Sequence, residues 1–194
     1  LGGKSTNKVF DDADFDAAIP VLVNAIVQNG GQTCSAGSRM LIQRSIYDRL
    51  MERVAERFAQ LRVGSSEMDL DCGPLISATQ MKRVQGYVDR AKADGVKVLA
   101  DAKIADGTPA GGFYVSPTLF GPVPRDNALA CEEVFGPVLS AIPFEDEADA
   151  IAKSNDISYG LSSYVWTENI GRAHRVAAAI EAGMCFVNSQ NVRD

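Results

Sequence analysis

The sequence predicts an α/β domain in which helices cover a mostly parallel sheet. Short apolar runs of strand length alternate along the chain with amphipathic runs of helix length, an order typical of parallel sheets with helical crossovers. The 194 residues suffice for one domain with a sizeable core. Because 46% of them are hydrophobic and 23% are charged, collagen-like, coiled-coil and disordered classes are excluded.

The expected elements follow from hydrophobic spacing and from the turn residues between them. In chain order they are an extended segment at 6–10, a helix at 12–28, a strand at 39–43, a helix at 46–61, a helix at 77–93, a strand at 96–99, an extended segment at 113–119, a strand at 138–142, a helix at 145–154, a strand at 161–166, a helix at 170–182 and a strand at 184–188.

The first helix carries apolar residues three and four positions apart, and Asp12 or Asp14 would cap its N-terminus. Pro20 lies inside this pattern and would end or kink the helix, unless the first turn begins close to it. The segment 29–31 (Asn-Gly-Gly) stops the helix, because glycine adopts left-handed backbone angles at little cost. Residues 32–38 therefore form a loop before the next strand.

The later elements rest on the same kinds of evidence. The second helix places Leu50, Val54 and Phe58 on one face, and the third ends at Asp94 and Gly95. The last third of the chain alternates regularly between helix and strand and contains no repeat. Together these elements predict a single α/β domain over residues 1–194.

Charge and hydropathy narrow the range of partners. A formal charge of -6 repels phosphate backbones, so nucleic acid is not an expected partner. No apolar run reaches the roughly 18 residues of a membrane-spanning helix, so no membrane is expected. The first residues lack the pattern of a secretory signal, and the chain has no initiator Met, so we expect a cytoplasmic fragment of a larger protein.

The four cysteines do not form a metal or disulfide pattern. Cys34, Cys72, Cys131 and Cys185 are far apart, without a C-x-x-C pair or a matching histidine cluster, so no metal site is predicted. Their irregular spacing favours free thiols in a reducing compartment. Only Cys34 lies in a polar loop between a helix and a strand, where a scaffold can present a nucleophile. Spacing alone leaves the alternative open that Cys34 is a small buried residue.

Other candidate groups are weaker. Gly3-Lys4-Ser5 matches the end of a phosphate-binding loop, but such a loop opens into a helix, whereas an extended segment follows here. His174, the single histidine, is expected on a helix surface, which disfavours a histidine-based triad. Glu132 and Glu133 precede an apolar turn that would hold one carboxylate against a cleft wall, although a plain turn is the default interpretation from composition.

Three segments together resemble the aldehyde dehydrogenase superfamily. They are Leu1 to Ser5 (LGGKS), Gly31 to Arg39 (GQTCSAGSR) and Glu132 to Val138 (EEVFGPV), and they occur in the family's order and spacing. Pro117 to Leu119 and Asn155 to Leu161 add further matches, so the resemblance covers essentially the whole chain.

The resemblance implies a Rossmann-like catalytic domain and a set of residue roles. Cys34 would attack the carbon of a small-molecule aldehyde to give a thiohemiacetal, which passes a hydride to NAD or NADP and becomes a thioester. The backbone N–H of Cys34 would support the oxyanion. Glu133 would bind the hydroxyls of the nicotinamide ribose, and Phe135 would pack beside the nicotinamide ring.

The same resemblance indicates what lies outside this chain. The family's general-base glutamate would immediately precede Leu1, and its cofactor-binding domain and second oxyanion donor would lie further upstream. We therefore expect the catalytic domain of a larger protein, homo-oligomeric in its parent form, with little dehydrogenase turnover by itself. The segment 188–194 resembles the branch that oxidises hydroxymuconic semialdehydes in aromatic catabolism; betaine-aldehyde-like and broad-range branches stay open.

Two other classes of function are considered. An inert folded module would use exposed former interfaces for self-association or partner binding. A cysteine esterase or thioesterase would be acylated at Cys34, but the sequence offers it no plausible histidine base.

Overall fold

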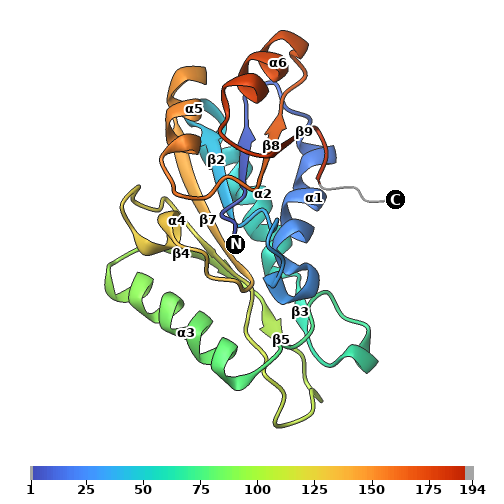
Figure 1. Ribbon diagram of the computed structural model, residues 1–194. Coiled ribbons are helices and arrows are strands. Elements are labelled where there is room, and N and C mark those ends of the chain that lie inside the picture. Colours follow the sequence, from blue (N-terminus) through green and yellow to red (C-terminus); the bar gives the residue numbers. More distant parts are fainter. Residues whose placement is uncertain (1, 191–194) are drawn as a thin grey trace.

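The protein is built around one twisted sheet with helices on both faces (Figure 1), and the computed structural model describes residues 2–190. The strands of this sheet are β1 (Thr6–Val9), β2 (Arg39–Gln43), β4 (Val98–Asp101), β6 (Thr118–Phe120), β7 (Val138–Phe144), β8 (Ser162–Trp166) and β9 (Met184–Val187). Two short strands, β3 (Arg62–Val63) and β5 (Lys103–Ile104), form a separate parallel pair below it.

The large sheet has seven strands in the order β4-β6-β7-β2-β1-β8-β9. Every neighbouring pair is parallel except β4 and β6, which run antiparallel at one edge. The prediction of a mostly parallel α/β sheet is therefore confirmed. The antiparallel edge strand β4 was not foreseen, and it follows from a connection that returns through the irregular segment 105–117 without a crossover helix.

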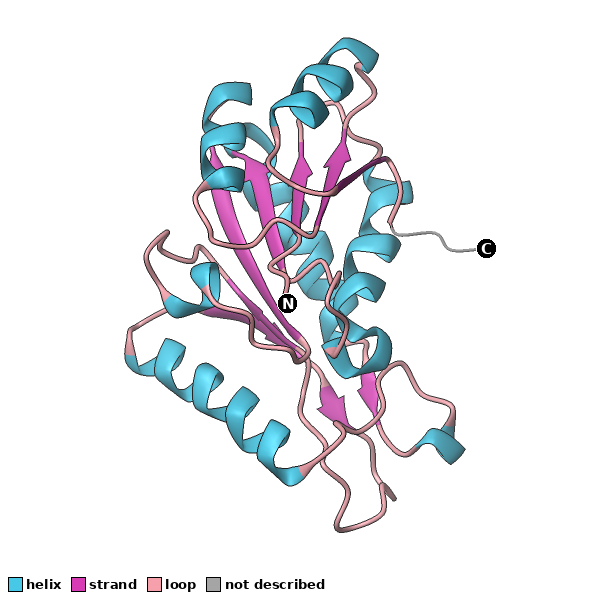
Figure 2. Cartoon of the chain, viewed as in Figure 1, coloured by secondary structure: helices cyan, strands magenta, loops and turns pink. Residues whose placement is uncertain are grey.

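Helices cover the sheet on both sides, as the cyan elements around the magenta strands show (Figure 2). They are α1 (Phe15–Val27), α2 (Tyr47–Ala59), α3 (Ala78–Ala93), α4 (Ala128–Cys131), α5 (Glu147–Asn155) and α6 (Ile170–Ala179), with 3-10 turns at Gln28–Gly31, Arg44–Ile46 and Ser66–Met68. Two buried clusters result. Met40 and Ile42 belong to the cluster under α1 and α2, whereas Leu41 between them belongs to the other.

The first helix shows how local sequence sets an element. Asp14 is the N-cap, and its carboxylate accepts hydrogen bonds from the N–H groups of Asp16 and Ala17 at 2.9 and 3.1 Å. Pro20 lies inside α1 without ending it. Since Pro20 and Asp16 are both exposed, water can satisfy the carbonyl that loses its helical partner.

The structure differs from expectation mainly at element ends. The extended segment expected at 113–119 becomes a strand only from Thr118, since Pro117 before it lacks an N–H for a ladder. The strand expected at 96–99 begins later, because Val96 N–H still bonds to Ala91 O at the end of α3. No helix of residues 2–190 has the length and apolarity needed to cross a membrane.

Candidate active site

The loop that carries Cys34 leaves α1 through a run of left-handed residues. Asn29, Gly30 and Gly31 have φ values of 53°, 61° and 71°, which reverse the chain within one turn. The loop is then fixed by Ala36 N–H, which bonds to Thr33 O at 2.9 Å. The Cys34 side chain is exposed, and all four cysteines of the chain are free thiols. This corrects the alternative that Cys34 is a buried core residue.

Two glycines allow close packing among the three segments that carry the family resemblance. A Cβ on Gly3 would lie 2.0 Å from the carbonyl oxygen of Cys34, and one on Gly31 would lie 2.3 Å from the carbonyl carbon of Gly136. Any side chain at Gly3 or Gly31 would displace backbone. The Tyr164 hydroxyl also donates to Ser35 O at 2.7 Å and ties the loop to β8.

Glu133 lies against the same N-terminal segment. Its Oε1 accepts a hydrogen bond from Gly3 N–H at 2.8 Å, and its Oε2 would be 2.7 Å from a Cβ on Gly2. Arg83 donates to the Glu133 carbonyl at 2.7 Å. Through Gly3, the structure brings Glu133 and Cys34 into one neighbourhood.

The neighbouring Glu132 has a different position. Its Oε2 accepts a hydrogen bond from the Tyr87 hydroxyl at 2.7 Å and is therefore directed toward α3. Together with burial, this contact raises the pKa of Tyr87. Of the carboxylate pair noted in the sequence, only Glu133 contacts the cysteine region.

Phe135 is held in a strained backbone conformation. Its φ of 58° is unusual for a residue with a side chain, and such angles persist where the surroundings enforce them. The amide of Gln80 supplies that support, since its Nε2 donates to Phe135 O at 2.7 Å and to Val134 O at 3.3 Å. Phe135 itself is half-buried.

Phe135 forms part of a hollow of about 590 Å³, which we call the apolar hollow. Its other walls are Asn29, Gln32, Pro74, Leu75, Ile76, Gly112 and Phe113. Ile76 is 80% exposed there, a high value for an isoleucine. An exposed apolar surface of this kind fits a flat ring or another protein segment.

A second hollow, of about 630 Å³, is lined in part by Thr33, Ser35 and Ala36 of the cysteine loop, and we call it the polar hollow. Its hydrogen-bonding side chains are Asn24, Gln28, Thr33, Ser35, Asn188, Ser189 and Gln190. Pro20, Val21, Ala25 and Ala36 complete the wall. Cys34 is exposed and lies in the chain between two wall residues, Thr33 and Ser35.

Three buried basic side chains lie behind the cysteine region. Lys4, Lys8 and Arg39 are at most 1% exposed. Burial, with the nearby Arg39 charge, lowers the pKa of Lys4 to about 7, and burial likewise lowers the pKa of Lys8 to about 7. Lys8 donates to Thr6 O at 3.0 Å and to the Ser163 hydroxyl. The Lys4 amine has no acceptor among the described residues.

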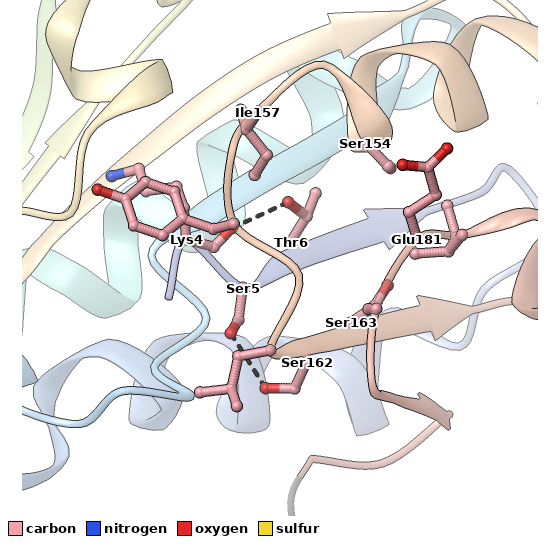
Figure 3. Close-up of a pocket in the computed structure, with 12 residues that line it drawn as sticks. Lys4, Ser5, Thr6, Ser154, Ile157, Ser162, Ser163 and Glu181 are labelled. Atoms are coloured by element: carbon pink, nitrogen blue, oxygen red, sulfur yellow. Dashed lines mark hydrogen bonds between the residues drawn. The ribbon is translucent and has the colours of Figure 1, made fainter. Parts of the chain in front are cut away.

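A water-sized cavity of about 10 Å³ lies beside Lys4 (Figure 3). The Ser5 and Ser162 hydroxyls, which line it, hydrogen-bond to each other at 3.1 Å. Sequence reasoning missed this buried cluster. The sequence feature that pointed to this region was the Gly3-Lys4-Ser5 segment. It leads into β1 and not into a helix, in agreement with the argument against a phosphate-binding loop.

The remaining candidates lie outside this region. His174 is exposed on α6, as a helix surface residue should be. Within residues 2–190, no group of three or more histidine, cysteine or carboxylate side chains is placed to hold a metal ion.

Comparison with known proteins decides the family. The model of the aldehyde dehydrogenase family matches residues 1–194. The chain belongs to the aldehyde dehydrogenase family. A putative aldehyde dehydrogenase from Burkholderia cenocepacia is 51% identical, with a TM-score of 0.99 over 100% of this chain and 41% of that one.

Other aldehyde dehydrogenase structures are similar over the same region. HpcC from Thermus thermophilus is 42% identical, with a TM-score of 0.93 over 100% of this chain and 39% of that one. Betaine aldehyde dehydrogenase from Staphylococcus aureus, solved with NAD+, is 36% identical, with a TM-score of 0.92 over 100% and 39%. The chain thus spans about two fifths of the length of these proteins.

Proposed function

We propose that residues 1–194 form the catalytic domain of an NAD(P)-dependent aldehyde dehydrogenase, with Cys34 as its nucleophile. The observation that carries this proposal is the exposed Cys34 thiol on a loop whose carbonyl packs against Gly3, which in turn bonds to Glu133. A nucleophile on a loop fixed by such contacts is preorganised for attack.

The chain's own residues would carry the first covalent step. The Cys34 thiolate adds to the aldehyde carbon and forms a C–S bond, while the carbonyl π electrons move to the aldehyde oxygen. No hydrogen bond among the described residues uses the Cys34 N–H, so this donor is available to the developing oxyanion. The second donor and the general base for deacylation belong to segments outside this chain.

Glu133 and Phe135 fit a nicotinamide nucleoside. Oε1 of Glu133 bonds to Gly3, and Oε2 makes no hydrogen bond with the described residues, so it can accept one from a ribose hydroxyl. The Phe135 ring lines the apolar hollow beside it, where a flat aromatic ring can pack. A nicotinamide cofactor, when bound, would supply the acceptor for the hydride. These residues do not discriminate NAD from NADP.

The finer assignments belong to the same proposal. Four free thiols suit a reducing compartment such as the cytoplasm. A homo-oligomeric parent and a role in aromatic catabolism are proposed from the family resemblance, the latter from the segment 188–194, of which residues 191–194 lie outside the described part of the chain.

The proposal is tested by acylation with p-nitrophenyl acetate. We expect a burst of about one equivalent of p-nitrophenol per chain, with the acetyl group mapped to Cys34 by peptide mass spectrometry and little turnover afterwards. Cys34→Ser is the matched variant, and it should lose the burst while its melting temperature stays the same, because the side chain is exposed.

The alternatives give different results. Sustained turnover after the burst would identify a cysteine esterase or thioesterase. The absence of a burst, with all four thiols equally unreactive toward the ester, would leave an inert module and contradict the proposal.

A further inference from the structure

We infer that the polar hollow selects aldehydes whose chain carries neutral hydroxyl groups, over alkyl, cationic and anionic aldehydes. This inference rests on the proposed function, because it assigns the polar hollow to the part of the substrate that does not react. It names a substrate class that neither the family nor the similar structures assign to this chain. It also favours a neutral substrate over the carboxylate-bearing semialdehydes of the aromatic-catabolism assignment, so the test below decides between the two.

The position of the hollow follows from the chain. Thr33 and Ser35 line it, and Cys34 lies between them. Consecutive Cα atoms are about 3.8 Å apart, so an aldehyde carbon bonded to Cys34 would lie within a few atoms of the wall. Asn24 and Gln28, at the end of α1, line the same hollow as Thr33 and Ser35.

Two of those side chains are available for a ligand. Asn24 and Gln28 are exposed, lie one helical turn apart at the C-terminal end of α1 and make no side-chain hydrogen bond with the described residues. By contrast, the Asn188 amide is occupied, since it donates to Thr167 O and accepts from Thr167 N–H at 2.9 and 3.0 Å.

The chemistry of the wall favours a neutral hydroxylated chain. Amides both donate and accept, as hydroxyl groups do, so Asn24 and Gln28 can each bond to a hydroxyl in either direction. No charged side chain of residues 2–190 lines the hollow. A carboxylate tail would meet no lysine or arginine, and a quaternary ammonium tail would meet neither a carboxylate nor an aromatic face.

The test measures how well aldehydes protect Cys34 from iodoacetamide at pH 7, read by peptide mass mapping. The probes are glyceraldehyde and propanal, which both have three carbons, with betaine aldehyde as the cation and succinic semialdehyde as the anion. Each protection constant is divided by that of N-acetylcysteine with the same aldehyde, which removes differences in intrinsic reactivity. We expect glyceraldehyde to exceed the other three by about fivefold or more, the effect of one or two net hydrogen bonds.

Paired variants connect this preference to the hollow. Asn24→Leu with Gln28→Leu should reduce the preference for glyceraldehyde over propanal to about onefold. The matched control Gln60→Leu, exposed at the end of α2 and outside the hollow, should retain it. Equal melting temperatures of the three proteins would show that folding is unaffected.

The outcomes separate this inference from the proposed function. Protection that is equal or better with propanal, betaine aldehyde or succinic semialdehyde would overturn the inference, as would a preference that persists in the double variant. If no aldehyde protected Cys34, the proposed function would fail first, and the inference with it.

Discussion

The two hollows beside the cysteine loop differ in chemistry although they share that loop. The polar hollow is lined by amide and hydroxyl side chains, whereas the apolar hollow is lined mainly by proline, leucine, isoleucine and phenylalanine. Gln32 belongs to the apolar side and Thr33 to the polar side, so the change occurs within two residues of Cys34. The loop that carries the proposed nucleophile thus contributes residues to two surfaces that suit different ligands.

This difference indicates that backbone contacts, and not the side chains of either hollow, position Cys34. Gly3 and Gly31 fix the loop from behind through close backbone approaches. The side chains on both sides can then vary in polarity without moving Cys34. On the proposed function, specificity for substrate and cofactor would therefore be separable from placement of the nucleophile.

The largest expected effect comes from breaking that placement. Gly3→Ala puts a Cβ 2.0 Å from the Cys34 carbonyl oxygen, so backbone must move and both hollows must change together. We expect a loss of about 2–3 kcal/mol in the free energy of unfolding, as for other overpacked sites, and slower alkylation of Cys34. Urea denaturation and peptide mapping measure the two effects.

Gly86→Ala is the control for this substitution. A Cβ on Gly86 meets nothing within 4 Å, and the residue lies in the middle of α3, so alanine should stabilise the protein by about 1 kcal/mol. An equal loss of stability in both variants would contradict the role assigned to Gly3.

A smaller effect per residue is the pH dependence of the free energy of unfolding, which arises from the buried lysines Lys4 and Lys8. Burial lowers the pKa of Lys4 and Lys8 from 10.5 to about 7, so between pH 7 and 10 the unfolded chain holds more protons than the folded one. The free energy of unfolding should therefore rise with pH, by about 2 kcal/mol for each of the two lysines between pH 7 and 9. Above pH 9 the gain is opposed, because burial and Asp71 raise the pKa of Cys72 to about 11.

Lys4→Met should raise stability at pH 7 and reduce the slope, whereas Lys82→Met, at an exposed site on α3, should leave both unchanged. Urea titrations at pH 7, 8 and 9 give the slope. A steeper slope in the Lys4→Met variant would be incompatible with an uncharged buried amine.

The smallest effect separates the two hollows directly. Phe135→Ala removes an aromatic wall of the apolar hollow only, and we expect the affinity for an apolar fluorescent dye such as anilinonaphthalene sulfonate to fall about fivefold. Aldehyde protection of Cys34 should be unchanged. A parallel loss of both would show that the hollows are not independent.

Much of the fold was predictable from the sequence because its helices and strands carry strong periodic signals. The central strands β2, β7 and β8 and the helices α1 to α3 lie where spacing and caps placed them, within a few residues. The family resemblance predicts roles for Cys34, Glu133 and Phe135, and these roles stay predictions. The structure connects Cys34 and Glu133 through Gly3 and places Phe135 in the wall of the apolar hollow.

The remainder depends on tertiary contacts that local sequence does not encode. Lysine and arginine are rarely buried, so the sequence offers no reason to expect the burial of Lys4, Lys8 and Arg39. The close approaches of Gly3 and Gly31 join segments more than 30 residues apart. The polarity of the hollow beside Cys34 also depends on residues from α1 and from the chain after β9.

The central claim is that Cys34 is the nucleophile, and the rate of alkylation of each cysteine by iodoacetamide at pH 7 tests it most directly. Cys34 should react more than about tenfold faster than the half-buried Cys131 and Cys185 and faster than N-acetylcysteine, while buried Cys72 should be slowest. Reaction of Cys34 at or below the rate of Cys131 and Cys185 in the folded protein would contradict the claim.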